Sequence, residues 1–335
     1  MNKEDVVVGT IGLASIGVGW WGAHLAERST AGGRAKLVAC FARSPEKREA
    51  FADLFGCRAA TSFGEVLSDP EVDGVIIATA HTSHLELIEA AAAAGKHVFV
   101  EKPLTLELME ARAAVAAAEA AGIVVQVGHQ RRRAPGNRKM KSLLEDGTLG
   151  HVQVIASHHH SPNGLRMPDT AWRRSPDESP LGSMTSLAVH SLDTFLYLCG
   201  PIQRIFTATR PPREGRTIDE ATALTVEFES GVLGSILTSF FVPALVEMSI
   251  HGSHGAAFSR DDATRLSLTL LEPAGTEELE LAAVDPVEEE LTEFVRAIAG
   301  EVQPETGVRE GLAVVAALAA AVESARTGAA VVVAR

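Results

Sequence analysis

The sequence has little cysteine, little aromatic character and a deficit of basic residues. Its three cysteines, Cys40, Cys57 and Cys199, are scattered without Cys-x-x-Cys spacing, which predicts no disulfide framework and fits a reducing compartment. The net charge of −13 gives no electrostatic support for binding nucleic acid or an anionic membrane. No apolar run approaches the length of a membrane span. We therefore expect a cytoplasmic protein.

The single tyrosine excludes one class of dehydrogenase. Short-chain dehydrogenases need Tyr-x-x-x-Lys, whereas the residue four positions after Tyr197 is Pro201. Residues 1–5 lead into a strand-like run rather than the apolar core of a signal peptide, which agrees with the expected compartment.

The length of 335 residues predicts two domains. The first, residues 1–128, alternates apolar strand-like runs with helical segments, the pattern of a doubly wound α/β sheet. The predicted strands include residues 6–16, 37–41, 74–78, 96–100 and 123–128, and we expect about six parallel strands. This pattern predicts a Rossmann dinucleotide-binding domain.

A glycine-rich loop follows the first predicted strand. Gly17, Gly19 and Gly22 form a complete Gly-x-Gly-x-x-Gly between a strand and a helix that starts at Trp20-Trp21. Glycines at this spacing let the backbone turn tightly and approach a pyrophosphate at the helix N-terminus. An alternative turn near Gly9–Gly12 stays open.

The end of the second predicted strand indicates which cofactor is bound. An NAD site usually has Asp or Glu here, to bind the ribose hydroxyls. This chain has Ala42-Arg43-Ser44, with a guanidinium and a hydroxyl that suit a 2′-phosphate. We therefore favour NADP over NAD; the alternative is that Arg43 is only a solvated residue at a strand end. The next helix is expected to begin at Ser44-Pro45 and to end before Gly56.

The stretch Val98–Pro103 is the other candidate site in this half. A buried strand reaches Glu101-Lys102 and ends at Pro103, because proline cannot donate to a sheet. The carboxyl edge of such a sheet is where ligands bind. Lys102 is then either a chemical group at this edge or a surface lysine paired with Glu101.

The second half, residues 129–335, changes pattern. It starts with the basic cluster His129-Gln130-Arg131-Arg132-Arg133. This cluster is either a solvated face or, at the carboxyl end of a strand, a site for an anionic cofactor or substrate. Alternating strands then dominate, with a hairpin turn at Ser230-Gly231. We expect an α+β domain with a largely antiparallel sheet. The strand and helix predictions cover residues 151–160, 202–210, 221–229, 232–242, 245–251 and 266–272 for strands, and 136–146, 185–198, 287–298 and 308–326 for helices.

Several stretches together resemble the Gfo/Idh/MocA oxidoreductase family, which includes glucose–fructose oxidoreductase and inositol dehydrogenase. They are Gly17–His24, Ala78–His84, Gly95–Val98 leading into Glu101-Lys102-Pro103, Val127–Arg132 and Leu181–Asp193. The Glu-Lys-Pro context is much more specific than the glycine loop.

The resemblance implies hydride transfer between a nicotinamide and a carbinol or carbonyl carbon of a sugar, a cyclitol or a related compound. It also implies an N-terminal Rossmann domain and a second, substrate-binding and oligomerisation α+β domain built on an open, mostly antiparallel sheet. It implies a substrate site between the two domains, Lys102 and His190 as the catalytic pair, and a Lys102–Pro103 bond that is cis in such proteins. Substrate-binding residues are then Lys102, Arg131, Ser186, His190 and Asp193. The cofactor-binding residues are expected to be Gly17, Gly19, Trp20, Trp21, Gly22, Ala42, Arg43, Ser44, Ala78, Thr79, His81, His84, Glu101, Lys102, Gln130, Trp172 and Arg173.

One position departs from the family pattern, which is Asp-x-x-x-His-x-x-Asp. Here Ser186 replaces the first Asp. On an α-helix Ser186, His190 and Asp193 share one face, so the serine can hydrogen-bond the histidine ring but supplies no charge. Either His190 works with a weaker orienting partner, or another group transfers the proton.

Other functions remain open. The alternatives are an NAD-dependent glycosidase of the same fold and a cofactor-binding regulator without catalysis. His158-His159-His160 is a weak metal candidate, because only His158 and His160 share a strand face and no further ligands with zinc spacing accompany them. We therefore expect no metal, and a homodimer or homotetramer formed through an uncovered sheet face.

Overall fold

The computed structural model describes residues 10–335, so the first part of the predicted strand at 6–16 lies outside the described residues. The described chain divides into two compact units. The first unit contains residues 10–104, Glu110–Gly128 and Val287–Arg309, and the second contains Thr105–Met109, His129–Pro286 and Glu310–Arg335. No helix of the described part is long and apolar enough to cross a membrane.

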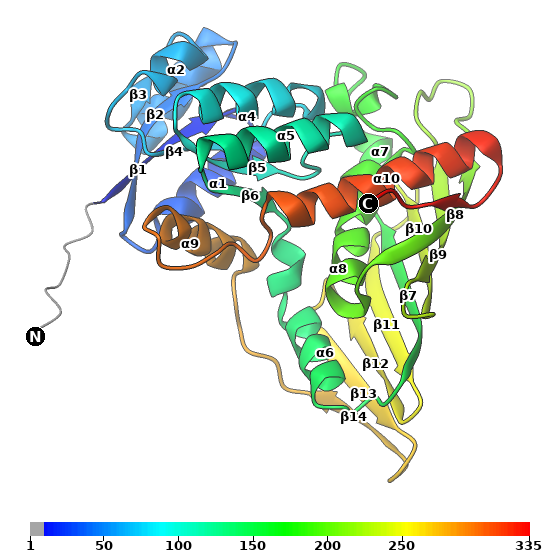
Figure 1. The fold of residues 1–335 in the computed structure, drawn as a ribbon. Helices are drawn as coiled ribbons and strands as arrows, with labels where there is room; N and C mark the ends of the chain where they lie inside the picture. The colour runs from blue at the N-terminus through cyan, green and yellow to red at the C-terminus, as the bar shows by residue number, and fades with distance from the viewer. Residues whose placement is uncertain (1–9) are drawn as a thin grey trace, which may run out of the picture. The chain divides into compact units, whose positions relative to one another are not determined.

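The first unit is built on a six-stranded parallel sheet in the order β3-β2-β1-β4-β5-β6 (Figure 1). This confirms the predicted Rossmann sheet. Its strands are β1 (Ile11–Ile16), β2 (Ala35–Phe41), β3 (Arg58–Ala59), β4 (Gly74–Ile77), β5 (His97–Glu101) and β6 (Val125–Gly128). Its helices are α1 (Trp20–Thr30), α2 (Pro45–Phe55), α3 (Phe63–Leu67), α4 (His84–Ala93), α5 (Leu108–Ala121) and α9 (Pro286–Ile298), with a short η1 (His81–Ser83).

Local sequence signals explain where these helices begin and end. The Ser44 hydroxyl accepts from the Lys47 backbone N–H at 3.3 Å, Pro45 is the first residue of α2, and Gly56 ends it with φ +65°. This capping agrees with the prediction.

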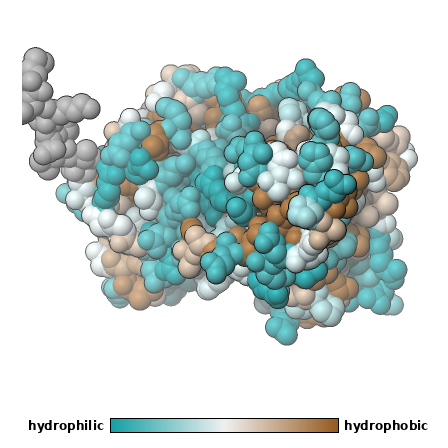
Figure 2. All heavy atoms as spheres, turned by 90° about the horizontal axis from the view of Figure 1, so that it is seen from below, coloured by the Kyte–Doolittle hydropathy of each residue, from teal (hydrophilic) through white to brown (hydrophobic). Residues whose placement is uncertain are grey.

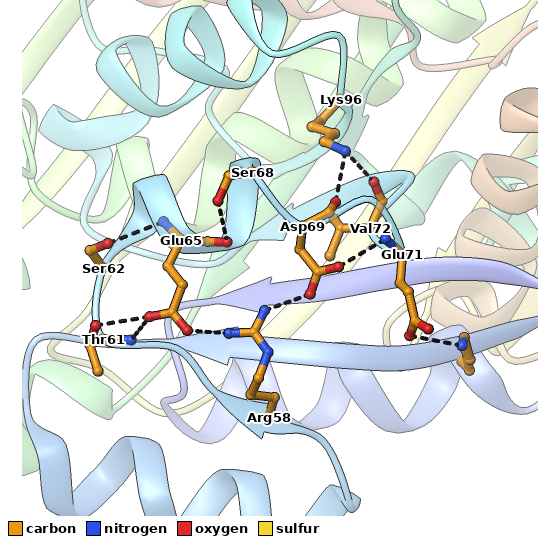
Figure 3. A network of polar contacts seen from close by, with 10 residues as sticks. Arg58, Thr61, Ser62, Glu65, Ser68, Asp69, Glu71, Val72 and Lys96 are labelled. Atoms are coloured by element: carbon orange, nitrogen blue, oxygen red, sulfur yellow. Dashed lines mark hydrogen bonds and ion pairs between the residues drawn. The ribbon is translucent and has the colours of Figure 1, made fainter.

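A polar network fixes the edge of the sheet around β3 (Figure 3). Arg58 binds the carboxylates of Glu65 and Asp69, and the Ser62 hydroxyl caps α3 by accepting from the Glu65 backbone N–H at 3.1 Å. Lys96 donates to the Asp69 carbonyl at 3.0 Å. The short β3, which the sequence did not indicate, has only two residues in the ladder. The ion pairs of Arg58 with Glu65 and Asp69 add to the few backbone hydrogen bonds of this strand.

Helix α9 belongs to the first unit although it comes late in the chain. Its side chains Leu291, Phe294 and Val295 pack with Leu13 and Phe99 in one buried cluster. The predicted division into 1–128 and 129–335 is therefore incomplete: residues 287–309 return to the first unit because the apolar face of α9 covers part of its sheet.

The second unit is built on a nine-stranded sheet in the order β14-β13-β12-β11-β7-β10-β9-β8-β15. All recorded pairs are antiparallel except β7 with β10, which confirms the expected mostly antiparallel sheet. Its strands are β7 (Val152–His160), β8 (Ile202–Arg210), β9 (Ala221–Phe228), β10 (Leu233–Ser239), β11 (Leu245–Gly252), β12 (Gly255–Arg260), β13 (Arg265–Leu270), β14 (Gly275–Leu279) and β15 (Val331–Val332).

Helices cover one face of this sheet. They are α6 (Pro135–Glu145), α8 (Val189–Cys199) and α10 (Val308–Thr327). The second unit also contains α7 (Asn163–Arg166) and the 3₁₀ turns η2 (Gln130–Arg133) and η3 (Trp172–Arg174). Side chains of α6, α8 and α10 form one core with the strands, as with Phe195, Leu318 and Ile236. The predicted helix at 185–198 differs in its first turn, because Met184–Ala188 (η4) is a π-helix and α8 starts only at Val189.

The opposite face of the sheet exposes apolar side chains. Val154, Phe206, Leu233 and Leu237 alternate with core residues along their strands and are 41–52% exposed. Figure 2 shows hydrophobic side chains gathered among hydrophilic ones on the face of the molecule that it draws. The expected homodimer or homotetramer stays a prediction.

Candidate active site

The glycine loop has the shape of a pyrophosphate cradle. Gly17 has φ +96°, and a Cβ there would lie 2.4 Å from the Ala78 carbonyl oxygen; a Cβ on Gly22 would lie 2.1 Å from the Gly17 carbonyl oxygen. A Cβ on Gly19, in contrast, would meet no described atom within 4 Å. Gly19 directly precedes α1. The loop is therefore tightly packed at Gly17 and Gly22, and it leaves space at Gly19, beside the backbone N–H groups that begin the helix. These residues fit a dinucleotide.

The two tryptophans of this loop have different surroundings. Trp20 is 80% exposed, whereas the Trp21 indole donates to Glu101 Oε1 at 2.5 Å. Trp21 therefore ties the start of α1 to the end of β5. An exposed tryptophan at the mouth of the loop is consistent with a surface that a cofactor covers.

At the end of β2, Arg43 is exposed, and the described residues record no hydrogen bond or ion pair for it. The Ser44 hydroxyl is engaged, because besides capping α2 it donates to Glu46 Oε2 at 2.8 Å. Glu46 thus places a carboxylate beside Ser44 that the sequence argument did not consider. Arg43 remains the strongest candidate of the Ala42–Ser44 stretch for a phosphate.

Lys102 lies directly after β5, at the carboxyl edge of the sheet. The Glu101 carboxylate beside it is buried and also accepts from the Lys102 backbone N–H at 3.3 Å. A Cβ on Gly128 would lie 2.8 Å from Glu101 Oε1, so glycine at this position makes room for the carboxylate. The Lys102–Pro103 bond is cis, as the resemblance implies, and the Lys102 side chain is half-buried.

The Ala78–His84 stretch follows the neighbouring strand β4. The Thr79 and Ser83 hydroxyls lie 2.7 Å apart, and His84 Nδ1 lies 3.0 Å from the Pro103 carbonyl oxygen. His81 and His84 are both buried, with ring centroids 5.8 Å apart. His84 therefore supports the backbone that carries Lys102, while Thr79 lies beside the glycine loop, its Cγ2 3.1 Å from a Cβ placed on Gly17.

In the second unit His190 lies near two further histidines, His129 and His159. His190, on the first turn of α8, is buried, and its ring centroid lies 6.3 Å from that of His159 on β7 and 6.3 Å from that of His129. The rings of His190 and His159 are stacked at 28°, and His129 stands at 86° to His190. The π turn before α8 is a feature that often marks functional sites.

Asp193 does not act as a partner of this histidine. Arg132 donates to both its carboxylate oxygens at 2.7–3.0 Å, and both side chains are buried. Ser186 lies in the π turn, so the expectation that Ser186, His190 and Asp193 form one face of a regular α-helix is wrong.

Arg131 contacts the histidine cluster formed by His129, His159 and His190. Its guanidinium lies 3.5 Å from His159 Nε2 and pairs with the Asp262 carboxylate, while Asn137 Nδ2 donates to the Arg131 carbonyl at 2.8 Å. Burial lowers the pKa of Arg131 to about 10, so it is cationic at neutral pH. His159 and Asp262 were not predicted as site residues. Strand alternation indicates only that His159 faces the opposite side of the sheet from His158 and His160. No sequence signal marks Asp262.

A cavity of about 20 Å³ lies between Arg131, His159 and His190, with room for a single water. The Ser157 and Ser191 hydroxyls, 2.8 Å apart, also line it. This lining of donors and acceptors suits a polar ligand group.

The remaining candidates lie elsewhere in the second unit. Gln130 is in η2, and the Arg173 guanidinium lies 4.0 Å from the ring centroid of Trp172 in η3. His158 and His160 stack at 5.8 Å on the open sheet face, as alternation predicts, and His158 Nδ1 lies 3.0 Å from Glu247 Oε1. Among the described residues no group of three or more His, Cys, Asp or Glu side chains is arranged to hold a metal ion.

Comparison with known proteins decides the family. The profile of an oxidoreductase family with an NAD-binding Rossmann fold matches residues 11–129, and the profile of the Gfo/Idh/MocA C-terminal domain matches residues 137–258. The chain belongs to the Gfo/Idh/MocA oxidoreductase family. It is 30% identical to 1,5-anhydro-D-fructose reductase of Ensifer adhaerens over 329 residues, which cover 96% of each chain.

Two further Gfo/Idh/MocA comparisons are informative. The chain is 30% identical to 2,7-anhydro-N-acetylneuraminate hydratase of Escherichia coli over 234 residues, 68% of this chain and 61% of that protein. A candidate NADPH-dependent oxidoreductase from Desulfitobacterium hafniense has a similar solved structure, with a TM-score of 0.92 and 27% identity over 97% of this chain and 98% of that one. The chain is thus a nicotinamide-dependent enzyme of this family, in agreement with the cofactor expected from its glycine loop.

Proposed function

We propose that this enzyme reduces a carbonyl group of a sugar-like small molecule, or oxidises the corresponding alcohol, with NADP as its preferred cofactor. The observation that carries the proposal is the position of Lys102 at the carboxyl edge of a sheet whose glycine loop is open at Gly19. The exposed Arg43 guanidinium at the end of β2 supports NADP. The bound nicotinamide supplies or accepts the hydride.

Lys102 is proposed to stabilise charge on the reacting oxygen. A cationic donor in a site that excludes water stabilises a developing alkoxide more than it does in bulk solvent. The side chain starts from a rigid point, because Glu101 is held by Trp21 and accepts from the Lys102 backbone N–H. A fixed start lowers the entropic cost of orienting the ammonium.

His190 is proposed to move the proton. In the reductive direction its imidazolium gives a proton to the carbonyl oxygen as the hydride arrives at carbon, and in the oxidative direction the neutral ring takes the hydroxyl proton. Proton transfer by a positioned histidine typically contributes about 10²–10⁴-fold in rate. The small cavity next to His190 is lined by polar side chains that suit a hydroxyl group.

An anhydro sugar is the first substrate to test. The relative that aligns over 96% of both chains reduces 1,5-anhydro-D-fructose according to its name, and the hydratase relative acts on an anhydro sugar as well. We propose that the substrate is a cyclic, hydroxyl-rich ketone of this kind. NADPH consumption with 1,5-anhydro-D-fructose, and NADP⁺ reduction with myo-inositol as the cyclitol alternative, discriminate between these substrates.

A second candidate follows from the hydratase relative, since a redox-neutral reaction would use the cofactor only transiently. Product formation from an anhydro sugar with a catalytic amount of NAD(P)⁺ and no net change in NAD(P)H would favour this alternative. Stoichiometric consumption of NADPH would favour the reductase.

A further inference from the structure

His190 lacks the carboxylate that the family pattern places four residues before it, yet it lies in a cluster with a fixed charge pair. We propose that His159 and Arg131, anchored by Asp262, are positioning residues that hold the ring and the charge state of His190 in place of that carboxylate. This inference rests on the proposed role of His190.

His159 is held rigidly against His190. It lies in a central strand, paired with Thr238 of β10 and Val246 of β11, and the Thr238 hydroxyl donates to the His159 carbonyl at 2.7 Å. Its ring is buried and stacks at 28° on the His190 ring. The sheet therefore fixes the His159 ring that lies beside the His190 ring.

Arg131 selects the protonation state of His159. A guanidinium has only N–H donors, so at 3.5 Å it uses His159 Nε2 as an acceptor, which requires that nitrogen to be without a proton. Protonation of His159 at Nε2 would lose this contact and place a second cation beside Arg131. This contact therefore disfavours the doubly protonated ring of His159 and favours a proton on His190 or His129 instead.

Asp262 fixes Arg131 through a strained turn. Asp261, Asp262 and Ala263, between β12 and β13, have φ values of +51°, +60° and +63°, in the left-handed region that residues with a side chain rarely adopt. The turn is held from two sides: Asp262 N–H donates to the Val246 carbonyl at 3.3 Å, and Gly136 N–H donates to the Ala263 carbonyl at 2.8 Å. Strain of this kind persists where the surroundings require it, and here it directs a carboxylate at Arg131.

The charges of Arg131 and Asp262 predict in which direction each variant shifts the titration of His190. Removing the Asp262 carboxylate leaves the Arg131 cation uncompensated and disfavours the charged form of His190, whereas removing Arg131 favours it. The titratable and charged groups around the cavity are His129, His159, Arg131, Glu247, Asp262 and, beyond His190 on α8, the Arg132–Asp193 pair. Glu247 Oε1 lies 3.0 Å from His158 Nδ1, whereas the Arg131 guanidinium contacts both His159 and Asp262.

The test is an NMR titration of the histidine ring protons in the full-length protein, which needs no substrate. Spectra of His190→Ala and His159→Phe assign the two rings. We expect the midpoint for His190 to move to lower pH in Asp262→Asn and to higher pH in Arg131→Met, by roughly half a pH unit or more. We also expect the His159 ring not to titrate between pH 5 and 8 in the wild type, about the range in which an unperturbed histidine titrates. Shifts in the same direction, or none, would overturn the proposal.

Asp261→Asn is the matched control, because Asp261 has the same backbone conformation and charge but faces Arg265, at 3.6 Å. Its titration curve should equal that of the wild type; a shift as large as that of Asp262→Asn would mean that the turn acts only through general charge. Asparagine tolerates the left-handed region, so both variants are expected to fold.

Kinetics separate this inference from the proposed function. With NADPH and 1,5-anhydro-D-fructose, Asp262→Asn should lower kcat roughly tenfold with little change in KM. If His190→Ala keeps wild-type turnover, the proposed role of His190 fails. If His190→Ala loses turnover while Asp262→Asn and His159→Phe do not, only the positioning role fails.

Discussion

The Arg132 guanidinium binds both carboxylate oxygens of Asp193 at 2.7–3.0 Å, with both side chains buried between η2 and α8. A buried ion pair is costly to break because one charge remains without a partner in a poorly solvated place. Asp193→Ala should lower the free energy of unfolding by about 3–5 kcal/mol, measured by urea denaturation.

The same measurement has an internal control. Glu229→Ala removes the partner of Arg335 in an exposed pair, where we expect a loss below about 1 kcal/mol. A loss for Asp193→Ala as small as this would show that the buried pair adds little. The double variant Asp193→Leu with Arg132→Met should recover part of the stability, because it leaves no buried charge.

The glycine loop predicts that folding and cofactor binding can be separated. The Cβ added by Gly19→Ala would meet no described atom within 4 Å, so this variant should unfold like the wild type. It should bind NADPH at least roughly tenfold more weakly, because the added methyl group would occupy the space where the pyrophosphate approaches. Gly17→Ala places a Cβ 2.4 Å from a backbone oxygen and should lower stability as well, by more than about 1 kcal/mol. Calorimetric unfolding and titration of NADPH against Trp20 and Trp21 fluorescence measure both effects. Unaltered NADPH affinity in Gly19→Ala would place the pyrophosphate elsewhere.

Arg43 should determine the preference for NADP. A charge-assisted hydrogen bond to a 2′-phosphate contributes about 1.5–3 kcal/mol, so Arg43→Ala should weaken NADPH binding roughly ten- to a hundredfold and leave NADH binding nearly unchanged. Arg34→Ala is the matched control, because it removes the same charge just before β2, at the opposite end of that strand, where Arg34 pairs with Glu301. Equal weakening of both cofactors, or tighter binding of NADH than of NADPH by the wild type, would refute the assignment.

Glu220 gives stability a defined pH dependence. Its side chain is nearly buried, and hydrogen bonds from Arg213 and then Arg210 lower the pKa of the carboxyl from 4.5 to about 2. A lowered carboxyl pKa stabilises the fold above the unfolded value and is lost as the pH falls through the folded value. The difference in thermal unfolding midpoint between the wild type and Glu220→Gln should therefore be constant above about pH 5 and shrink from pH 4.5 towards pH 2. A difference that does not change with pH would mean that Glu220 acts through packing.

Much of the fold was predictable because its signals are local. Short apolar runs that alternate with helical segments determine the Rossmann sheet, and Ser44, Pro45 and Gly56 mark the ends of α2. The strands β3, β12, β14 and β15 were missed, since β3 and β15 have two residues each and β14 has four of its five residues exposed. Nothing local indicates that α9 returns to the first unit, which depends on packing with residues far away in sequence.

The candidate site was also predictable only where its signals are local in the sequence. The glycine loop and Lys102 could be located from sequence, because a strand that ends in a turn or at proline places them at the sheet edge. The Arg131–Asp262 pair joins residues 131 positions apart and could not be predicted. The partner of Asp193 was missed for the same reason, since Arg132 reaches it from 61 positions away.

The most direct test of the proposed function is single-turnover oxidation of NADPH by 1,5-anhydro-D-fructose in the wild type and in Lys102→Met, with NADPH affinity measured in parallel by tryptophan fluorescence. We predict that the wild type consumes one NADPH per carbonyl reduced, and that Lys102→Met binds NADPH equally well but reacts about 10²–10³-fold more slowly, because it lacks the charge that stabilises the alkoxide. Equal rates in the two proteins, or a wild type that binds NADPH and reduces no cyclic ketone, would contradict the account.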